Sequence, residues 1–305
     1  MRAAAVRLAG RCLQFALVLG ALLGPVSAAL AQTPTTLAPR PMRFYFFSPD
    51  WRPADLNTLT ERVHVALRNE GLEVSFQGFA RYEDFVRQVA ELAPSFLLAP
   101  GWFQNTAASD LGLYLQPIAT PLRHNRTTYR KALITRAGLN SIADLTRGSI
   151  AAAVHALGPG DEGAVLDSLH LNAGSTRVVP VPKDLDGLLA LSFEQVDAAL
   201  VTAQQFDLLA ASNPETAAKL QVLAFSVPIP LPGVFAGPQT TTEDRRRMAA
   251  ALAKFGDAEA GREVLTMLGY DSFEVLTPAQ QEQPAAEQPA DGPPAHRHAK
   301  NRKAK

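Results

Sequence analysis

Hydrophobic and polar positions in the first third of the chain alternate between the spacings of strands and helices. Residues 44–47 form an aromatic run of strand type, and residues 72–76 alternate with period two. An apolar stripe with helical spacing comes after each of these strands, at residues 59–67 and 82–89. A further apolar run occupies residues 96–99. The order strand, helix, strand, helix, strand predicts a parallel sheet with right-handed crossovers.

The same alternation begins again near residue 127 and continues to about residue 220. The sequence predicts a capped helical turn at residues 141–145, helices at 164–171 and 185–192, and strands at 129–134, 150–154, 178–181 and 198–201. Residues 196–207 are the most informative stretch, because a buried strand there runs into a polar loop that opens a helix. Loops of this kind at the carboxyl ends of strands form ligand sites in open α/β sheets.

The last third of the ordered pattern is predicted to return to the first unit. Residues 220–225 predict a strand and residues 228–232 a stiff, proline-rich crossing, and helices follow at 242–256 and 258–268. We therefore expect an α/β fold of two lobes, each a mostly parallel sheet flanked by helices, joined by two hinge crossings. The expected division is lobe 1 at residues 43–120 plus 228–276, and lobe 2 at 121–227.

The two ends of the chain differ from the region between them. Residues 1–31 carry arginines, an apolar core and Ala29-Leu30-Ala31, which predicts a cleavable signal peptide and export to the periplasm. The alternative is a transmembrane anchor, but the apolar run is short and interrupted. Residues 277–305 are rich in Pro, Ala, Gln and Glu and end in a cluster of histidine, lysine and arginine, which predicts a disordered tail.

Charge and cysteine content narrow the classes of function. Without the predicted signal and tail, 21 basic residues stand against 26 acidic residues, so the remaining chain carries about −5 and nucleic acid is not an expected partner. The single cysteine, Cys12, lies in the predicted signal. The mature protein would then have no disulfide, no thiolate metal site and no cysteine nucleophile.

Several ordered motifs resemble those of the phosphonate-binding proteins of bacterial ABC importers, which have the type 2 periplasmic binding fold. The matching pieces lie at residues 48–49, 82–86, 129–134, 141–148, 196–199 and 267–273. Their order covers nearly all of residues 43–276. The resemblance implies a periplasmic substrate-binding component of an ABC importer, with a phosphonate or phosphate-like oxyanion as its ligand.

The loop after residues 150–154 departs from the family pattern. That family usually has a loop rich in serine and threonine here, which holds the oxyanion at a helix start. This chain instead has Asp161 and Glu162 within residues 158–163. Two carboxylates already satisfy the helix dipole and would repel a phosphonate, so a zwitterion or another polar solute is also a candidate ligand.

The predicted ligand site lies at the carboxyl ends of the strands of both lobes. In lobe 1 the candidate residues are Ser48, Tyr82 and Trp102. Trp102 could stack on a ligand and Tyr82 could donate from its hydroxyl group, or both could be core residues that cover the end of the sheet.

In lobe 2 the candidates are His155, Asp161, Glu162, Thr202 and Gln205. His155 could bind an anion or be a solvated loop residue. The two acids either select an amino group or only cap the helix. Thr202 and Gln205 open a helix and can present a hydroxyl, amides and a carboxamide to a ligand.

Enzymatic chemistry finds little support in the sequence. No G-x-S-x-G, phosphate-loop or zinc-ligand motif occurs, so we expect no catalytic residue, no metal and no cofactor. The carboxylate pairs Glu83 with Asp84 and Asp184 with Asp186 are interpreted as helix-start or surface features. We expect a monomer that binds a small molecule and an importer permease, and the alternative is a sensor module with the same fold that signals to a membrane partner.

Overall fold

Two main β-sheets organise the protein in the computed structural model, which describes residues 41–49, 55–145, 148–153, 161–171, 176–277 and 280, with backbone only at 161–164. The first sheet has six strands in the order β13-β4-β12-β3-β1-β2, and the second has five in the order β10-β6-β9-β7-β8. The predicted signal peptide and nearly all of the predicted tail lie outside the described residues.

The first sheet combines strands from both ends of the described chain. Strands β1, β2 and β3 are parallel neighbours, and β12, β4 and β13 extend the sheet with antiparallel pairing. The strand bounds are β1 Met42–Phe46, β2 Val74–Gly78, β3 Phe96–Ala99, β4 Gln116–Leu122, β12 Gly233–Ala236 and β13 Ser272–Val275.

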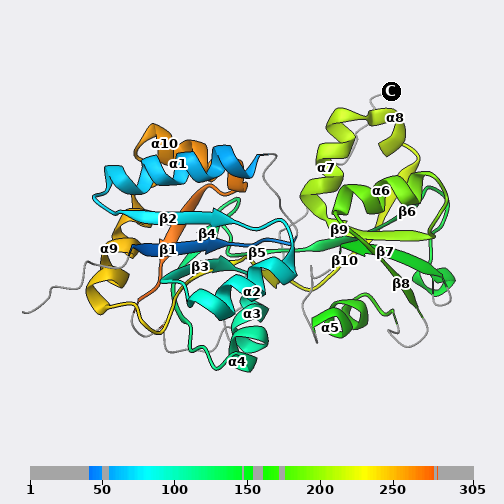
Figure 1. The fold of residues 1–305 in the computed structure, drawn as a ribbon. Helices are drawn as coiled ribbons and strands as arrows, with labels where there is room; N and C mark the ends of the chain where they lie inside the picture. Colours follow the sequence, from blue (N-terminus) through cyan, green and yellow to red (C-terminus); the bar gives the residue numbers. More distant parts are fainter. Residues whose placement is uncertain are drawn as a thin grey trace, which may run out of the picture. The chain divides into compact units, whose positions relative to one another are not determined.

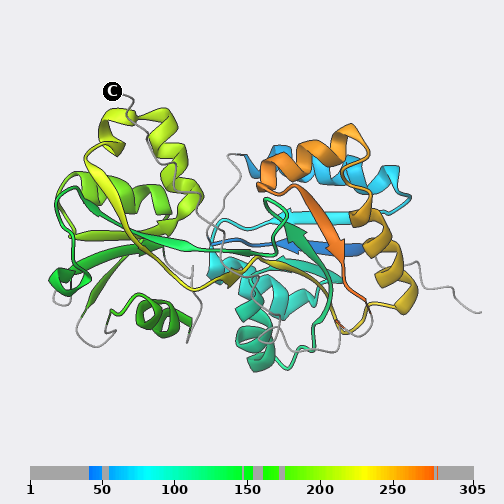
Figure 2. The same cartoon turned by 180° about the vertical axis from the view of Figure 1, so that it is seen from behind.

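Helices cover both faces of the first sheet. Helices α1 (Leu56–Asn69) and α10 (Glu259–Leu268) lie together over one face, and α2 (Tyr82–Leu92), α3 (Gly101–Asn105) and α4 (Ala107–Asp110) lie over the other (Figures 1 and 2). Helix α9 (Thr242–Ala253) packs against the end of the sheet that contains β13.

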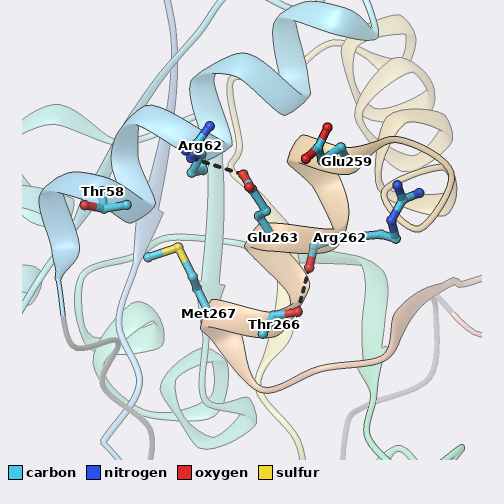
Figure 3. Close-up of a pocket in the computed structure, with 7 residues that line it drawn as sticks. All are labelled: Thr58, Arg62, Glu259, Arg262, Glu263, Thr266 and Met267. Atoms are coloured by element: carbon cyan, nitrogen blue, oxygen red, sulfur yellow. Dashed lines mark hydrogen bonds and ion pairs between the residues drawn. The ribbon is translucent and has the colours of Figure 1, made fainter.

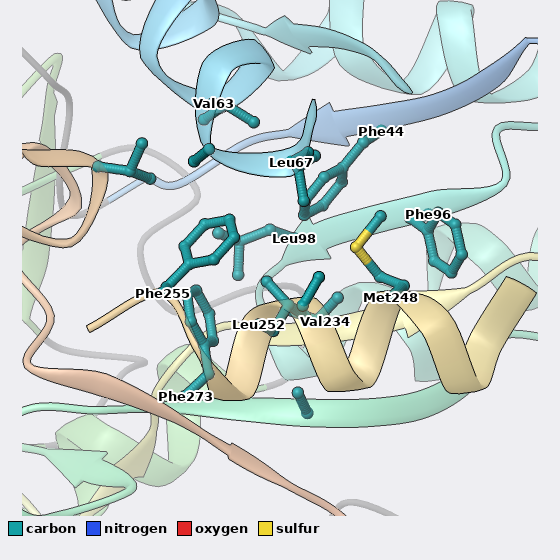
Figure 4. Packing of buried hydrophobic residues seen from close by; sticks show 14 of the residues in the cluster. Phe44, Val63, Leu67, Phe96, Leu98, Val234, Met248, Leu252, Phe255 and Phe273 are labelled. Carbon is teal, nitrogen blue, oxygen red and sulfur yellow. The ribbon is translucent and has the colours of Figure 1, made fainter. Parts of the chain in front are cut away.

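Alternation along β1 divides its aromatic side chains between the two faces. Phe44 and Phe46 join the core beneath α1, α9 and α10, whereas Tyr45 and Phe47 join the core beneath α2 and α3. Figure 4 shows the first of these cores, where Met248 of α9 lies among the aromatic rings. The two faces of this sheet are therefore both buried, which explains the continuous apolar run in the sequence.

The second sheet repeats the arrangement with smaller side chains. Strands β7, β8 and β9 are parallel neighbours, and β6 and β10 are added antiparallel. Helix α5 (Asp161–Ser168) covers one face, and α6 (Asp184–Ser192) and α7 (Ala203–Ser212) cover the other (Figure 1). The strand bounds are β6 Lys131–Arg136, β7 Ser149–Ala153, β8 Arg177–Val181, β9 Ala198–Thr202 and β10 Leu220–Phe225; the 3₁₀ turn η1 spans Ile142–Leu145 and helix α8 spans Pro214–Ala217.

Two segments of chain connect the sheets. One runs from the end of β4 to the start of β6, and the other runs from the end of β10 to the start of β12. They pair as the short antiparallel strands β5 (Thr128–Tyr129) and β11 (Ile229–Pro230). The serine that begins the return segment, Ser226, also exchanges hydrogen bonds with the backbone of Lys131.

The predicted α/β class and most predicted elements are confirmed, with three differences. The sheets are mixed, because the returning segments enter antiparallel, and parallel pairing is confined to β2-β1-β3 and β8-β7-β9. The sequence analysis did not predict β4, β12 or β13. Helix α5 begins at Asp161, three residues before its predicted start.

Candidate ligand-binding site

Five of the eight residues predicted to bind ligand lie at the carboxyl edges of the two sheets. Ser48 follows β1, Tyr82 begins α2 after β2, and Trp102 lies in α3 directly after β3. Thr202 is the last residue of β9, and Gln205 lies in the first turn of α7. The strands are parallel within each set, so each set of loops meets at one edge of its own sheet.

An aromatic edge, defined here as Phe47, Tyr82 and Trp102, closes the first sheet. The ring centroids of Phe47 and Tyr82 are 5.6 Å apart, and those of Tyr82 and Trp102 are 5.5 Å apart. Both pairs are within the range of favourable aromatic contact. Beneath them, the buried ring of Phe85 stacks on Phe47 and contacts Phe103, which fixes the edge to the core.

Polar atoms of the aromatic edge remain suited to binding. The indole Nε1 of Trp102 is buried and has no hydrogen-bond partner in the described structure. Burial raises the pKa of the Tyr82 phenol, and the nearby charges of Asp110 and Glu83 raise it further, so this hydroxyl stays protonated at neutral pH. Ser48, the residue after Phe47 in the sequence, is buried, at 9% exposed.

An ionic edge, defined here as Lys131, Asp184 and Thr202, closes the second sheet. The Nζ atom of Lys131 lies 3.2 Å from Oδ1 and 3.4 Å from Oδ2 of Asp184. The backbone N–H of Thr202 donates to Oδ2 of Asp184 at 2.6 Å. All three residues are buried, and the side chains of the ion pair are only 1% and 2% exposed.

Register and small side chains place this ion pair. Lys131 lies opposite Thr202 in the β6–β9 ladder. Gly187 of α6 faces Ala151 and Ala199 of the sheet. A Cβ atom built on Gly187 would be in van der Waals contact with the Cβ atoms of both alanines, so the helix lies close to the sheet. Its first residue, Asp184, is thereby held beside the end of β9.

The sequence analysis interpreted Asp184 as a helix-start or surface feature, and only the first of these descriptions fits the structure. Asp184 does begin α6, but its side chain is buried because it meets Lys131 and the backbone of Thr202. The sequence analysis also missed Lys131 as a member of this edge. A lysine within an otherwise apolar strand is a signal for it, since a buried ammonium group requires a buried counter-charge.

The amides at the start of α7 are largely used within the protein. Thr202 N–H donates to Asp184, Ala203 N–H donates to the carbonyl of Arg130, and Gln205 N–H donates to Oγ1 of Thr202. Thr202 is therefore the N-cap of α7, and its hydroxyl group, which accepts this bond, still has one hydrogen to donate. The side-chain Oε1 of Gln204 is buried and has no hydrogen-bond partner among the described residues.

Three predicted site residues cannot be compared with the structure. His155 lies outside the described residues. Asp161 and Glu162 are the first two residues of α5, but only their backbone is described. Their roles stay predictions.

A surface cavity of about 560 Å³ lies away from both edges, between α1 and α10 (Figure 3). Arg62 of α1 and Glu263 of α10 face each other across it, with Nε and Oε2 3.1 Å apart. Positively charged, negatively charged and uncharged side chains line the cavity. They are Thr58, Arg62, Glu259, Arg262, Glu263, Thr266 and Met267. None of the predicted ligand-binding residues contributes to it.

The described residues offer neither a metal site nor a membrane span. No three histidine, cysteine or acidic side chains among them are grouped so as to hold a metal ion. None of the helices within the described ranges has the length and apolar composition to cross a bilayer.

A family profile described as ABC transporter, phosphonate, periplasmic substrate-binding protein matches residues 47–281. This range contains both sheet edges and more than half of the chain. The chain belongs to this family. The phosphonate-binding family consists of periplasmic substrate-binding components of ABC transporters, which are binding proteins and not enzymes. The resemblance inferred from the ordered motifs is confirmed.

Solved structures agree on the fold. PhnD1 from Prochlorococcus marinus (MIT 9301), solved in complex with methylphosphonate, is 12% identical with a TM-score of 0.63, over 80% of this chain and 96% of that chain. PA3383 from Pseudomonas aeruginosa, a binding protein component of an ABC phosphonate transporter, is 16% identical with a TM-score of 0.62, over 79% and 83% of the two chains.

A third structure, XAC2383 from Xanthomonas citri bound to ATP, is 11% identical with a TM-score of 0.60, over 78% of this chain and 92% of that chain. At these identities the likeness establishes the two-lobed type 2 periplasmic binding fold. Comparison with curated proteins gives no match.

Proposed function

We propose that this member of the phosphonate-binding family takes up one small polar solute, a phosphonate or phosphate-like oxyanion or a zwitterion, in the cleft between its lobes. The lobes would correspond to residues 43–120 plus 228–276 and residues 121–227. The protein would act as a monomer in the periplasm after removal of residues 1–31, and would hand its ligand to an inner-membrane permease.

The observation that carries the proposal is the buried indole N–H of Trp102, which has no partner in the described structure. A buried donor without a partner costs about 1–3 kcal/mol, so a ligand atom that accepts from it gains that free energy. Trp102 stands beside the protonated hydroxyl of Tyr82 at the carboxyl edge of a parallel sheet. Ligands of open α/β folds bind at such edges.

The ligand class is supported by the contents of related structures and qualified by the charges of this chain. PhnD1 contains methylphosphonate and XAC2383 contains ATP, and both ligands carry phosphorus oxyanions. In this chain, however, Asp161 and Glu162 start α5, and Asp184 already neutralises Lys131. These acids favour a ligand of lower net negative charge over a fully ionised phosphate.

Ligand contacts from both lobes would favour the closed form. A solute that touches the aromatic edge and the ionic edge together binds the closed state more tightly than the open state, and the difference in affinity shifts the population. We assign Ser48, Tyr82 and Trp102 to the first lobe's share of the site, and His155, Asp161, Glu162, Thr202 and Gln205 to the second lobe's share. The permease would then recognise the closed form.

A thermal-shift screen of the purified protein tests the proposal. The panel consists of methylphosphonate, phosphate, methanesulfonate, amino acids and a buffer control. A true ligand at 100 times its Kd stabilises the protein by about 2.7 kcal/mol and raises Tm accordingly. No shift with any solute would contradict a receptor role, and turnover of any solute would contradict a pure binding function.

A further inference from the structure

The ion pair of the ionic edge is unusual because both charges are removed from water. Lys131 and Asp184 are 1% and 2% exposed, and burial of such a pair carries a desolvation cost that its Coulomb energy often fails to offset. Pairs that keep contact with solvent, such as Lys254 with Glu70 at 59% and 25% exposed, carry a much smaller cost. A buried pair at a ligand edge therefore points to a role in recognition beyond stability.

The contacts of the Asp184 carboxylate are those that a protein offers to a bound oxyanion. One ammonium group lies at 3.2 and 3.4 Å from its two oxygens, and the backbone N–H of Thr202, at the start of α7, donates to Oδ2. A lysine together with a backbone amide at a helix start is a common cradle for phosphate and carboxylate groups. Here the anion in the cradle is a side chain of the protein itself.

We propose that Asp184 is a specificity-determining residue, whose carboxylate occupies from within the chain an oxyanion position formed by Lys131 Nζ and Thr202 N–H. The inference rests on the proposed function and concerns which solutes the site accepts. The cradle is already filled and neutral, so the ionic edge gives no binding energy to a second negative charge. The ligand group that meets Thr202 is polar and uncharged, bound through the Thr202 hydroxyl.

Replacement of the carboxylate by an added anion tests whether the position is an oxyanion cradle. Asp184→Ala leaves space beside Lys131 and Thr202, and acetate is the probe because it has the same carboxylate group. We expect acetate to raise the Tm of Asp184→Ala in a saturable manner, with sodium chloride at equal ionic strength as the reference.

Two variants control this experiment. Asp186→Ala removes a carboxylate from the same turn of α6 without touching the ion pair, and should show no acetate-dependent rise beyond that of the unaltered protein. The double variant Lys131→Met with Asp184→Ala removes the cation and should lose the rise. An acetate effect equal in Asp184→Ala and Asp186→Ala would overturn the proposal, as would its persistence in the double variant.

A second variant measures specificity and covers the case in which Asp184→Ala does not fold. Asp184→Asn keeps the shape of the side chain and removes its charge. Methylphosphonate, used above its second pKa, is a dianion, and methanesulfonate is a monoanion of nearly the same shape. We expect Asp184→Asn to shift the affinity ratio of the two by about tenfold in favour of the dianion, because the variant removes one negative charge beside the ligand.

An unchanged affinity ratio in a folded Asp184→Asn would refute the role in specificity. The two proposals fail in different ways. If the unaltered protein binds no solute of the panel, the proposed function fails, but acetate binding by Asp184→Ala still reports on the cradle. If the unaltered protein binds a solute and neither Asp184 variant changes anion binding, the cradle fails and the proposed function stands.

Discussion

The carboxyl edges of the two sheets occupy equivalent positions in similar architectures but are built from opposite chemistry. The edge of the first sheet is aromatic, with Phe47, Tyr82 and Trp102 in successive contact. The edge of the second sheet is ionic, with Lys131 and Asp184 paired beneath Thr202. Under the proposed function, the two edges would recognise the two ends of one solute by different means.

The cores beneath the edges explain how each chemistry is supported. Phenylalanine fills both faces of the first sheet, and large rings extend to its edge. The second sheet has alanine at many buried strand positions, including Ala151 and Ala199, so α6 packs close enough for Asp184 to reach the end of β9. Side-chain size in the core therefore accounts for rings at one edge and a helix start at the other.

The largest expected effect comes from breaking the ionic edge. Lys131→Met leaves the carboxylate of Asp184 buried without its ammonium partner, and should lower the free energy of unfolding by about 3–5 kcal/mol. Urea denaturation measures the loss. The matched control is Lys254→Met, whose lysine pairs with Glu70 at the surface and should cost less than about 1 kcal/mol. Equal losses in the two variants would mean that the buried pair contributes no more than a surface pair.

A change at the aromatic edge should separate binding from stability. Trp102→Phe keeps a ring but removes the unpaired indole N–H, so affinity for the ligand should fall by about 1.5–3 kcal/mol if the ligand atom is charged. The free energy of unfolding should change by less than about 1.5 kcal/mol. Calorimetric titration and urea denaturation of the same samples give both numbers. Unchanged affinity would show that Trp102 is only a core residue.

Loss of the α7 cap should have a smaller effect on stability. Thr202→Ala removes the acceptor for Gln205 N–H and should lower the free energy of unfolding by about 1 kcal/mol. It also removes the hydroxyl proposed to meet the ligand, so binding should weaken as well. Thr202→Ser keeps the oxygen and should restore both properties. If Thr202→Ser binds as poorly as Thr202→Ala, the hydroxyl is not the contact.

The smallest expected effect concerns the opposite, amino end of the second sheet. The backbone N–H and the hydroxyl of Ser149 both donate hydrogen bonds to the carboxylate of Asp197. The bond from the backbone N–H is the main reason that the pKa of this carboxyl lies below its ordinary value; burial acts in the opposite direction and raises it. A lowered folded-state pKa contributes stability that is present above the unfolded-state pKa and is lost as pH falls through the folded-state pKa.

Ser149→Ala should therefore raise the pKa of Asp197, and carbon-detected NMR titration of the carboxyl group would measure this change. The accompanying loss of stability should appear at neutral pH, vanish in acid, and stay under about 1 kcal/mol because the Asp197 side chain is 47% exposed. A pKa of Asp197 equal in both proteins would show that the hydroxyl has no part in the shift.

The sequence predicted the alternation of elements well for two reasons. Both faces of each sheet are buried, which gives continuous apolar runs in β3 and β9. Helices α1 and α2 each bury one face, which gives them clear apolar stripes. It did not predict β12, since the pairing partners of this strand, β3 and β4, are more than 100 residues away in the sequence. Pairing between such distant segments leaves no local period.

The positions of the candidate residues were predictable for a similar reason. Tyr82, Trp102 and Thr202 lie at strand ends or at the helix starts that follow them, which are local features. Their part in ligand binding stays a prediction. The pair of Lys131 with Asp184 was not found, because its members are 53 residues apart and meet only through the β6–β9 register and the close approach of α6. Identification of such pairs requires the tertiary structure.

An NMR titration of the purified protein with methylphosphonate, or with the solute of the panel that binds, tests the central claim most directly. The chain has two tryptophans, so the indole N–H signal of Trp102 can be assigned by its disappearance in Trp102→Phe. We predict that this signal and the backbone amide signal of Thr202 move together along one isotherm with one Kd. Movement of only one of the two signals, or of each with a different Kd, would contradict a single solute held by both edges.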